Sequence, residues 1–239
     1  MTQPEKTSNE LSPLQKAYGV ISQLKHNVSE LKARAQEPIA VVGLACRAPT
    51  ANNANELWQL LVEGRHGMRE VPADRFDIEH YYDPRPGQAG KTYTRQAGFI
   101  DHVDQFDAAF FGISAREAEG MDPQQRLLLE VTWHALEDAG LVVSSLKGTM
   151  TGVYMGVTAS DYGYLQAQDK QQGEVNPYFN TGVPLNACAG RLSYVLGLQG
   201  PSMAIDTACS SSLTAIHLAC QALRARECEL ALAGGVNLT

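Results

Sequence analysis

The feature that most constrains this chain is a short apolar run followed at once by small residues and then by a helical pattern. The run Ser202–Ile205 is typical of a buried strand. The segment 207–212 holds only threonine, alanine, cysteine and serine. Apolar side chains then recur every three or four positions, at Leu213, Ile216, Cys220 and Leu223. The order predicts a strand that turns sharply into a helix, with Cys209 in the turn.

A cysteine at that position has two possible roles. The first amides of a helix lack internal partners and carry partial positive charge, so they stabilise a thiolate that lies close to them. The amide of Cys209 itself could form part of an oxyanion hole, and the small neighbours would let a substrate approach closely. This is the logic of a nucleophile elbow. The other reading is a small buried core residue, which is a common fate of cysteine.

The rest of the chain supplies the strands and helices of a layered protein. Ile39–Gly43, Gly152–Val157 and Glu229–Val236 are apolar runs of the buried, parallel type. Helices are predicted over residues 56–63 (closed by Gly64), over 123–139 (capped by Asp122 and closed by Gly140) and over 183–196. Residues 66–98 are rich in Pro, Gly, Asp and Arg, which predicts an irregular surface excursion.

The N-terminal segment predicts a separate helix over residues 12–36. Ser12 is suited to the N-cap and Pro13 to the first helical position. Apolar residues behind them follow a heptad register, at Leu14, Ala17, Ile21, Leu24, Val28, Leu31 and Ala35. Positions a and d therefore form the seam of a coiled coil, widened by Tyr18 and Val20. The alternative is a helix that packs on its own domain.

Composition excludes several classes of function. The 239 residues carry a formal charge of −7, which argues against non-specific nucleic-acid binding. No apolar run has the roughly 20 residues of a membrane span, and no signal-peptide pattern is present. The five cysteines and six histidines show no metal-ligand spacing. We therefore expect a cytoplasmic protein with reduced thiols, and no metal, membrane or nucleic-acid partner.

Four other polar residues are weighed as candidate catalytic groups. Gln124 and Gln125 lie in the first turn of a predicted helix, where structural hydrogen bonding accounts for them. His134 is predicted to be a partly exposed helix residue. His217 follows Cys209 by eight residues, about 12 Å along a helix axis, which is too far for a partner base.

The segment around Cys209, Asp206-Thr207-Ala208-Cys209-Ser210-Ser211-Ser212, resembles the active-site signature of β-ketoacyl synthases from modular type I polyketide synthases. The resemblance runs from about Glu37 to Thr239. Further motifs match in order: Glu37-Pro38-Ile39-Ala40-Val41-Val42-Gly43, Phe106-Asp107-Ala108-Ala109-Phe110-Phe111-Gly112-Ile113-Ser114, Met121-Asp122-Pro123-Gln124-Gln125-Arg126, Ala189-Gly190-Arg191-Leu192-Ser193-Tyr194 and Leu230-Ala231-Leu232-Ala233-Gly234-Gly235-Val236. The chain departs from the family at Arg47-Ala48-Pro49-Thr50, where the family usually has phenylalanine before the proline and glycine after it.

The resemblance implies a thiolase-like α/β fold in which Cys209 accepts an acyl chain. The chain arrives on the phosphopantetheine thiol of an acyl carrier protein, so no cofactor binds the enzyme directly. A malonyl-type unit then loses carbon dioxide and attacks the thioester. Some loading modules have glutamine at this position and only decarboxylate, so Cys209 favours true extension. The family's homodimers and N-terminal docking helices imply that residues 1–36 meet the C-terminal helices of an upstream subunit.

The resemblance also implies what the 239 residues lack. The family uses two histidines and a lysine from a second half, and none of those motifs occurs here. We therefore expect residues 37–239 to form the N-terminal half of the domain, inactive in condensation and prone to aggregate alone. Two alternatives remain: a fatty acid synthase-type condensing enzyme, and a truncated, non-catalytic docking protein.

Overall fold

The computed structural model describes residues 12–168 and 177–238, and the chain divides into two compact units, Met1–Ala40 and Val41–Thr239. The first unit contains helix α1, Pro13–Ala35. The Ser12 hydroxyl accepts a hydrogen bond from the Gln15 amide at 3.3 Å, and the Gln15 side chain accepts one from the Ser12 amide at 2.9 Å. This capping box confirms the predicted helix start. No residue of α1 is buried.

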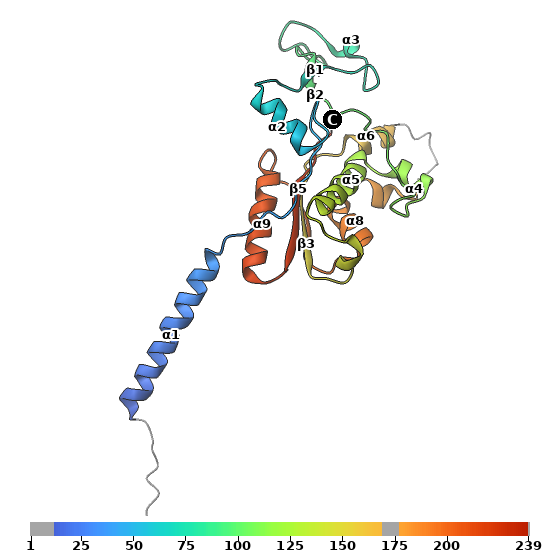
Figure 1. Ribbon diagram of the computed structural model, residues 1–239. Coiled ribbons are helices and arrows are strands. Elements are labelled where there is room, and N and C mark those ends of the chain that lie inside the picture. Colours follow the sequence, from blue (N-terminus) through green and yellow to red (C-terminus); the bar gives the residue numbers. More distant parts are fainter. Residues whose placement is uncertain (1–11, 169–176, 239) are drawn as a thin grey trace, which may run out of the picture. The chain divides into compact units, whose positions relative to one another are not determined.

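The second unit combines short helices with two separate sheets (Figure 1). Its helices are α2 (Ala54–Val62), α3 (Ile78–Tyr81), α4 (Ala115–Gly120), α5 (Pro123–Asp138), the 3₁₀ turn η1 (Val143–Leu146), α6 (Asp161–Gln168), α7 (Phe179–Gly182), α8 (Asn186–Leu196) and α9 (Ser211–Ala225). Its strands are β1 (Met68–Glu70), β2 (Gln96–Gly98), β3 (Thr151–Gly156), β4 (Ser202–Ile205) and β5 (Leu230–Gly235).

The main sheet is parallel, with the strand order β4-β3-β5. Gly156 at the end of β3 aligns with Ile205 on one side and with Gly235 on the other. The carboxyl ends of all three strands therefore lie at one edge of the sheet. In open parallel sheets this is the edge at which binding sites form.

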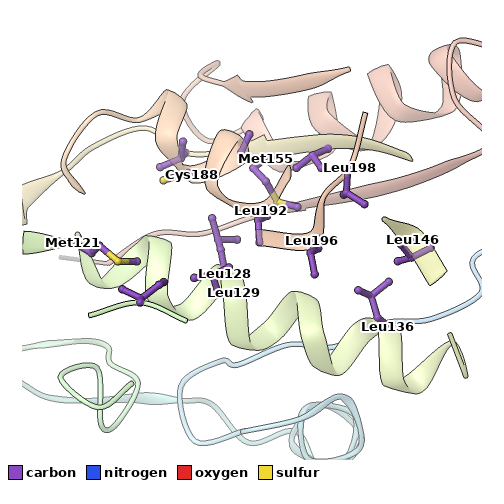
Figure 2. Close-up of a cluster of buried hydrophobic side chains, with 14 residues drawn as sticks. Met121, Leu128, Leu129, Leu136, Leu146, Met155, Cys188, Leu192, Leu196 and Leu198 are labelled. Carbon is purple, nitrogen blue, oxygen red and sulfur yellow. The ribbon is translucent and has the colours of Figure 1, made fainter. Parts of the chain in front are cut away.

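Helices cover both faces of this sheet (Figure 1). Alternate residues of β3 point to opposite faces. Val153 and Met155 join a cluster with α5 and α8, whereas Tyr154 packs against the alanines of α9. Figure 2 shows the first cluster, in which leucines of α5 and α8 meet beneath Met155. The predicted buried strand at 152–157 and the predicted helices at 123–139 and 183–196 are thus confirmed, although the last begins at Asn186.

The predicted strand at 39–43 is wrong, because residues 38–44 are irregular. Val41 and Val42 are 81% and 59% exposed. A strand needs a neighbouring strand for its backbone groups, and residues 38–44 pair with no strand of the sheet β4-β3-β5. Gly43 instead packs against the backbone of α5, and the Leu44 amide donates to the Asp138 carboxylate at 2.9 Å.

The excursion at 66–98 is more regular than its composition predicts. Strands β1 and β2 pair antiparallel, with Met68 opposite Gly98. Arg95 of the loop before β2 forms ion pairs with Glu70 and Glu79, and its guanidinium lies 4.8 Å from the centre of the Tyr82 ring. One arginine therefore ties three parts of the excursion together.

None of the helices within residues 12–168 and 177–238 has the length and apolar character required to cross a membrane. All five cysteines are unpaired thiols.

Candidate active site

Cys209 lies in the turn between β4 and α9, at the carboxyl edge of the sheet. The strand–turn–helix order predicted from the sequence is confirmed. The side chain of Cys209 is exposed, so the alternative of a buried core cysteine does not hold.

The turn itself is a compact set of local hydrogen bonds. The Ala208 amide donates to the Asp206 carboxylate at 3.0 Å. The Ser210 hydroxyl lies 2.8 Å from the Thr207 carbonyl oxygen and 2.9 Å from its hydroxyl. Ala208 has φ = +55°, a left-handed conformation that is uncommon for a residue with a side chain. The turn thus holds a constrained backbone immediately before Cys209.

The start of α9 is open toward Cys209. Ser210 occupies the N-cap, but no side-chain cap bond is made there. The amides of Ser210 and Ser211 donate back to the carbonyls of Thr207 and Ala208, at 3.4 and 3.1 Å. Within the described residues the amide of Cys209 donates to no acceptor. A thiolate or an oxyanion at this point would face the positive end of a 15-residue helix.

The other cysteines differ from Cys209 in burial. Burial, and secondly the Asp122 carboxylate, raise the pKa of the Cys188 thiol to about 12. Burial also raises the pKa of the Cys228 and Cys46 thiols. These three thiols are therefore poor nucleophiles at neutral pH.

The two glutamines have the structural role expected of them. Gln124 is 1% exposed, and its amide nitrogen donates to the Ala159 carbonyl at 2.6 Å. Gln125 donates to the Gly182 carbonyl at 2.7 Å and accepts from Arg191 at 2.8 Å. These bonds fix the start of α5 to the loops at the same sheet edge.

The histidines considered from the sequence lie apart from any cluster. His134 is exposed on α5 and lies 3.2 Å from Glu137. His217 is exposed on α9, in the second turn of the helix. The described residues contain no group of three metal-ligating side chains.

A cavity of about 520 Å³ lies away from Cys209, lined by Arg47, His102, Gln105, Phe106, Asp107 and Glu130. Burial raises the pKa of the Glu130 carboxyl, and Arg47, at 3.5 Å, opposes that shift. Its lining contains both signs of charge and no nucleophile, so the exposed turn at Cys209 is the better candidate site.

Sequence reasoning missed the residues that support the turn. Gly156 and Gly235, at the ends of β3 and β5, leave no room for side chains beneath the first residues of α9. Ser211 is 5% exposed and hydrogen-bonded inside the turn. The only sequence signal was the presence of glycines at the ends of two apolar runs.

Comparison with known families gives one consistent result. Residues 36–239 match the family model "Beta-ketoacyl synthase, N-terminal domain". The chain is 52% identical over 204 residues to a phenolphthiocerol/phthiocerol polyketide synthase of Mycobacterium tuberculosis, covering 85% of this chain and 11% of that protein. It is 48% identical over 227 residues to the type I polyketide synthase Pks15/1 of Mycobacterium bovis, covering 94% and 10%. The chain thus spans about a tenth of the length of these relatives.

Solved structures agree with the sequence matches. An oxazolomycin ketosynthase domain from Streptomyces albus has a TM-score of 0.76 and 40% identity, over 85% of this chain and 35% of that structure. A ketosynthase from module 6 of the bacillaene synthase of Bacillus subtilis has a TM-score of 0.72 and 40% identity, over 84% and 32%.

Proposed function

Because the chain belongs to the β-ketoacyl synthase family, we propose that it is the N-terminal half of a polyketide-extending ketosynthase and that Cys209 is its acyl-accepting nucleophile. The observation that carries this proposal is the position of Cys209 in an open turn at the start of α9. Of the five thiols, two are buried and two are half-buried. The residue types of the turn are those of the family's signature.

The proposed first step is a thioester exchange. The Cys209 thiolate attacks the carbonyl carbon of an acyl chain carried on phosphopantetheine, and the carbonyl oxygen becomes an oxyanion. The amide of Cys209, which donates to no described acceptor, supports a role in binding that oxyanion. The new carbon–sulfur bond remains, the bond to phosphopantetheine breaks, and the departing thiolate takes a proton from solvent.

The second step is decarboxylative condensation, which needs more than these residues. A malonyl-type unit loses carbon dioxide, and the resulting carbanion attacks the Cys209 thioester and releases the cysteine. We propose that the histidines and lysine of the family's second half serve this step, on the same polypeptide or on another one. The turn itself, residues 206–210, contains no histidine.

The partners follow from the reaction. We propose that carrier-protein domains deliver the acyl and malonyl groups, that phosphopantetheine enters only on those carriers, and that the enzyme works as a homodimer in the cytoplasm. The two compared relatives are named as polyketide synthases, which favours polyketide over fatty acid synthesis.

Thiol labelling tests the proposed nucleophile. A complete enzyme that contains these residues is treated at neutral pH with iodoacetamide or with a simple acyl thioester, and the adducts are mapped by mass spectrometry. Cys209 should react first, and Cys209→Ala should abolish acylation. In a complete enzyme Cys209→Gln should leave decarboxylation without condensation.

The other cysteines provide the controls for this experiment. Cys188 and Cys228 should stay unmodified because they are buried. Preferential acylation of any of the other four cysteines, with Cys209 untouched, would refute the proposal.

The exposed stripe of α1 favours an additional docking role for residues 1–36. The a and d side chains are exposed, from Leu14 at 82% to Val28 at 49%. We propose that α1 pairs in parallel with its own copy. In such a dimer the facing g–e′ pairs are Val20–Lys25 and Asn27–Lys32, and neither is an ion pair.

The charge of α1 suggests which further helix it accepts. Its one acidic residue, Glu30, lies 3.4 Å from His26, and the lysines of the helix outnumber it. The proposed partner is an acidic C-terminal helix of an upstream synthase subunit. Each exposed ion pair contributes only about 0.2–1 kcal/mol, so charge selects the partner while the apolar stripe supplies most of the affinity.

The docking role is tested with a peptide of residues 1–36. Its helicity should rise with concentration, and its affinity for acidic helical tails should fall as salt is added. Leu24→Asp should abolish both, whereas Ser22→Asp, which adds the same charge at an outward b position, should not. A peptide that stays monomeric and shows no preference for acidic tails would contradict the proposal.

A further inference from the structure

Ala208 occupies a conformation that its own side chain disfavours. Its φ of +55° lies in the left-handed region, which costs a non-glycine residue about 1–3 kcal/mol. Such a conformation persists only where the surrounding structure holds it. The residue lies directly before Cys209, so whatever holds Ala208 also sets the direction of Cys209.

The side chain of Ser211 holds the carbonyl group of Ala208 and the amide of the preceding residue, Thr207. The Ser211 hydroxyl donates to the Ala208 carbonyl oxygen at 2.7 Å, and the Ser211 amide donates to the same oxygen at 3.1 Å. The Thr207 amide donates to the Ser211 hydroxyl oxygen at 2.9 Å. The Thr158 hydroxyl lies 3.5 Å from it. With these three contacts the Ser211 hydroxyl uses its one donor hydrogen and both of its acceptor lone pairs.

The ends of strands β3 and β5 pack closely against Ser211 and Ser212. A methyl group added at Gly156 would lie 2.7 Å from the Ser211 carbonyl carbon and 2.7 Å from the Ser212 nitrogen. A methyl group added at Gly235 would lie 2.9 Å from the Ser212 Cβ. Both strand ends therefore contact the first residues of α9 directly. The hydrogen bonds that Ser211 makes to Ala208 and Thr207 therefore lie directly above the ends of β3 and β5.

We propose that Ser211 is a positioning residue for the acyl transfer, an inference that rests on the proposed nucleophilic role of Cys209. Its hydroxyl holds the Ala208 carbonyl, which shares one planar peptide group with the Cys209 N–H, and this fixes the direction of the Cys209 amide relative to the start of α9. Acyl transfer needs that relation, because the oxyanion must meet the amide while the sulfur bonds to carbon. Simple alkylation needs only an accessible thiolate.

Two reagents separate these requirements on one protein, a complete enzyme that contains these 239 residues. Rates of modification at Cys209 are measured with a small acyl thioester and with iodoacetamide, for the unchanged protein, Ser211→Ala and Ser212→Ala. Ser212 is the matched control, since it is exposed and its hydroxyl makes no hydrogen bond within the described residues. Ser211→Ala should slow acylation about tenfold or more while alkylation changes less than about twofold. Ser212→Ala should change neither rate.

The buried cysteines report whether a variant is still folded. If Cys188 and Cys228 stay unlabelled in Ser211→Ala, a selective loss of acylation supports the proposal. Equal rates in Ser211→Ala and Ser212→Ala, or equal slowing with both reagents, overturns it. If Cys188 becomes labelled, Thr158→Val decides instead: a selective, smaller loss of acylation supports the proposal, and an unchanged acylation rate overturns it. An unchanged protein that accepts no acyl group at Cys209 refutes the proposed function itself.

Discussion

Helices α5 and α9 begin at the same edge of the main sheet, yet their first turns are built in opposite ways. The Asp122 carboxylate caps α5 at 2.8 Å from the Gln124 amide, and Asp122 is 3% exposed. Gln124 also accepts from the Leu238 amide at 3.3 Å, just after β5. Helix α9 has no side-chain cap, and the turn before it is exposed.

The difference separates a helix start used for packing from one available for chemistry. Buried polar groups must be hydrogen-bonded, and the start of α5 meets this demand with internal partners. The start of α9 leaves its positive end facing solvent, where a substrate could supply the missing partner. Both helix N-termini carry a partial positive charge. They differ in whether a protein side chain accepts a hydrogen bond from the first amides of the helix.

The largest expected effect comes from disturbing the support of α9. Gly156→Ala places a methyl group against the backbone of Ser211 and Ser212 and should lower the free energy of unfolding by about 3 kcal/mol. It should also displace Cys209 and stop acylation. Chemical denaturation and thioester labelling measure both effects.

Gly190→Ala is the matched control for this prediction. Gly190 lies within α8, and an added methyl group meets nothing within 4 Å. The same substitution there should stabilise the protein by about 0.5–1 kcal/mol. If both variants behave alike, the glycine at the end of β3 has no special role.

Removing the side-chain cap of α5 should lower the free energy of unfolding and leave the acylation of Cys209 nearly unchanged. Asp122→Ala removes the cap and the 2.6 Å bond from the Ser160 hydroxyl, and should cost about 2 kcal/mol of unfolding free energy. Acylation of Cys209 should stay within about twofold. Asn53→Ala, which removes an exposed cap on α2, should cost only about 1 kcal/mol. A large loss of acylation in Asp122→Ala would show that the two helix starts are coupled.

Alkaline pH should lower the free energy of unfolding through the buried thiol of Cys188. The pKa of Cys188 is raised from 9.0 to about 12, so its neutral form stabilises the fold below about pH 9. That contribution is lost as pH rises from 9 toward 12, because the unfolded thiol ionises first. Between pH 9 and 10 Cys188 should lower the unfolding free energy by about 1 kcal/mol, and Cys188→Ala should make the fall with pH shallower by that amount. An identical slope in the variant would contradict the assignment.

The smallest effect is expected at the cap position of α9. Ser210→Ala removes bonds to Thr207 in an exposed turn, so unfolding free energy should change by only about 0.5 kcal/mol. Thermal denaturation of Ser210→Ala and of Asp122→Ala, measured under the same conditions, compares the costs of the two substitutions directly. A cost equal to that of Asp122→Ala would mean that the two termini are closed equally well.

The sequence correctly predicted the helix ends and the turn that depend on interactions between residues close together in the chain. Ser12, Asp122 and Gly140 marked helix ends where the structure has them. Cys209 was correctly assigned to a turn because a strand, small residues and a helical period follow one another directly.

Long-range packing could not be predicted in the same way. The apolar run 39–43 has the composition of a strand, but whether it enters a sheet depends on which distant segments come to lie beside it. The roles of Gly156 and Ser211 depend on segments more than fifty residues apart coming into contact. Thr50, where the family usually has glycine, has φ = +64°, so the conformation persists without the residue that favours it.

The order of the main sheet has a consequence for synthesis on the ribosome. Strand β3 pairs with β4 roughly 50 residues later and with β5 roughly 80 residues later. At about 5–20 residues per second, β3 waits roughly 4–16 s for its second neighbour to be made. For most of that interval β3 has no strand beside it, and after β4 is made it has only one. Such non-local pairing folds slowly. A chaperone that shields the nascent chain would therefore be most useful between the synthesis of β3 and that of β5.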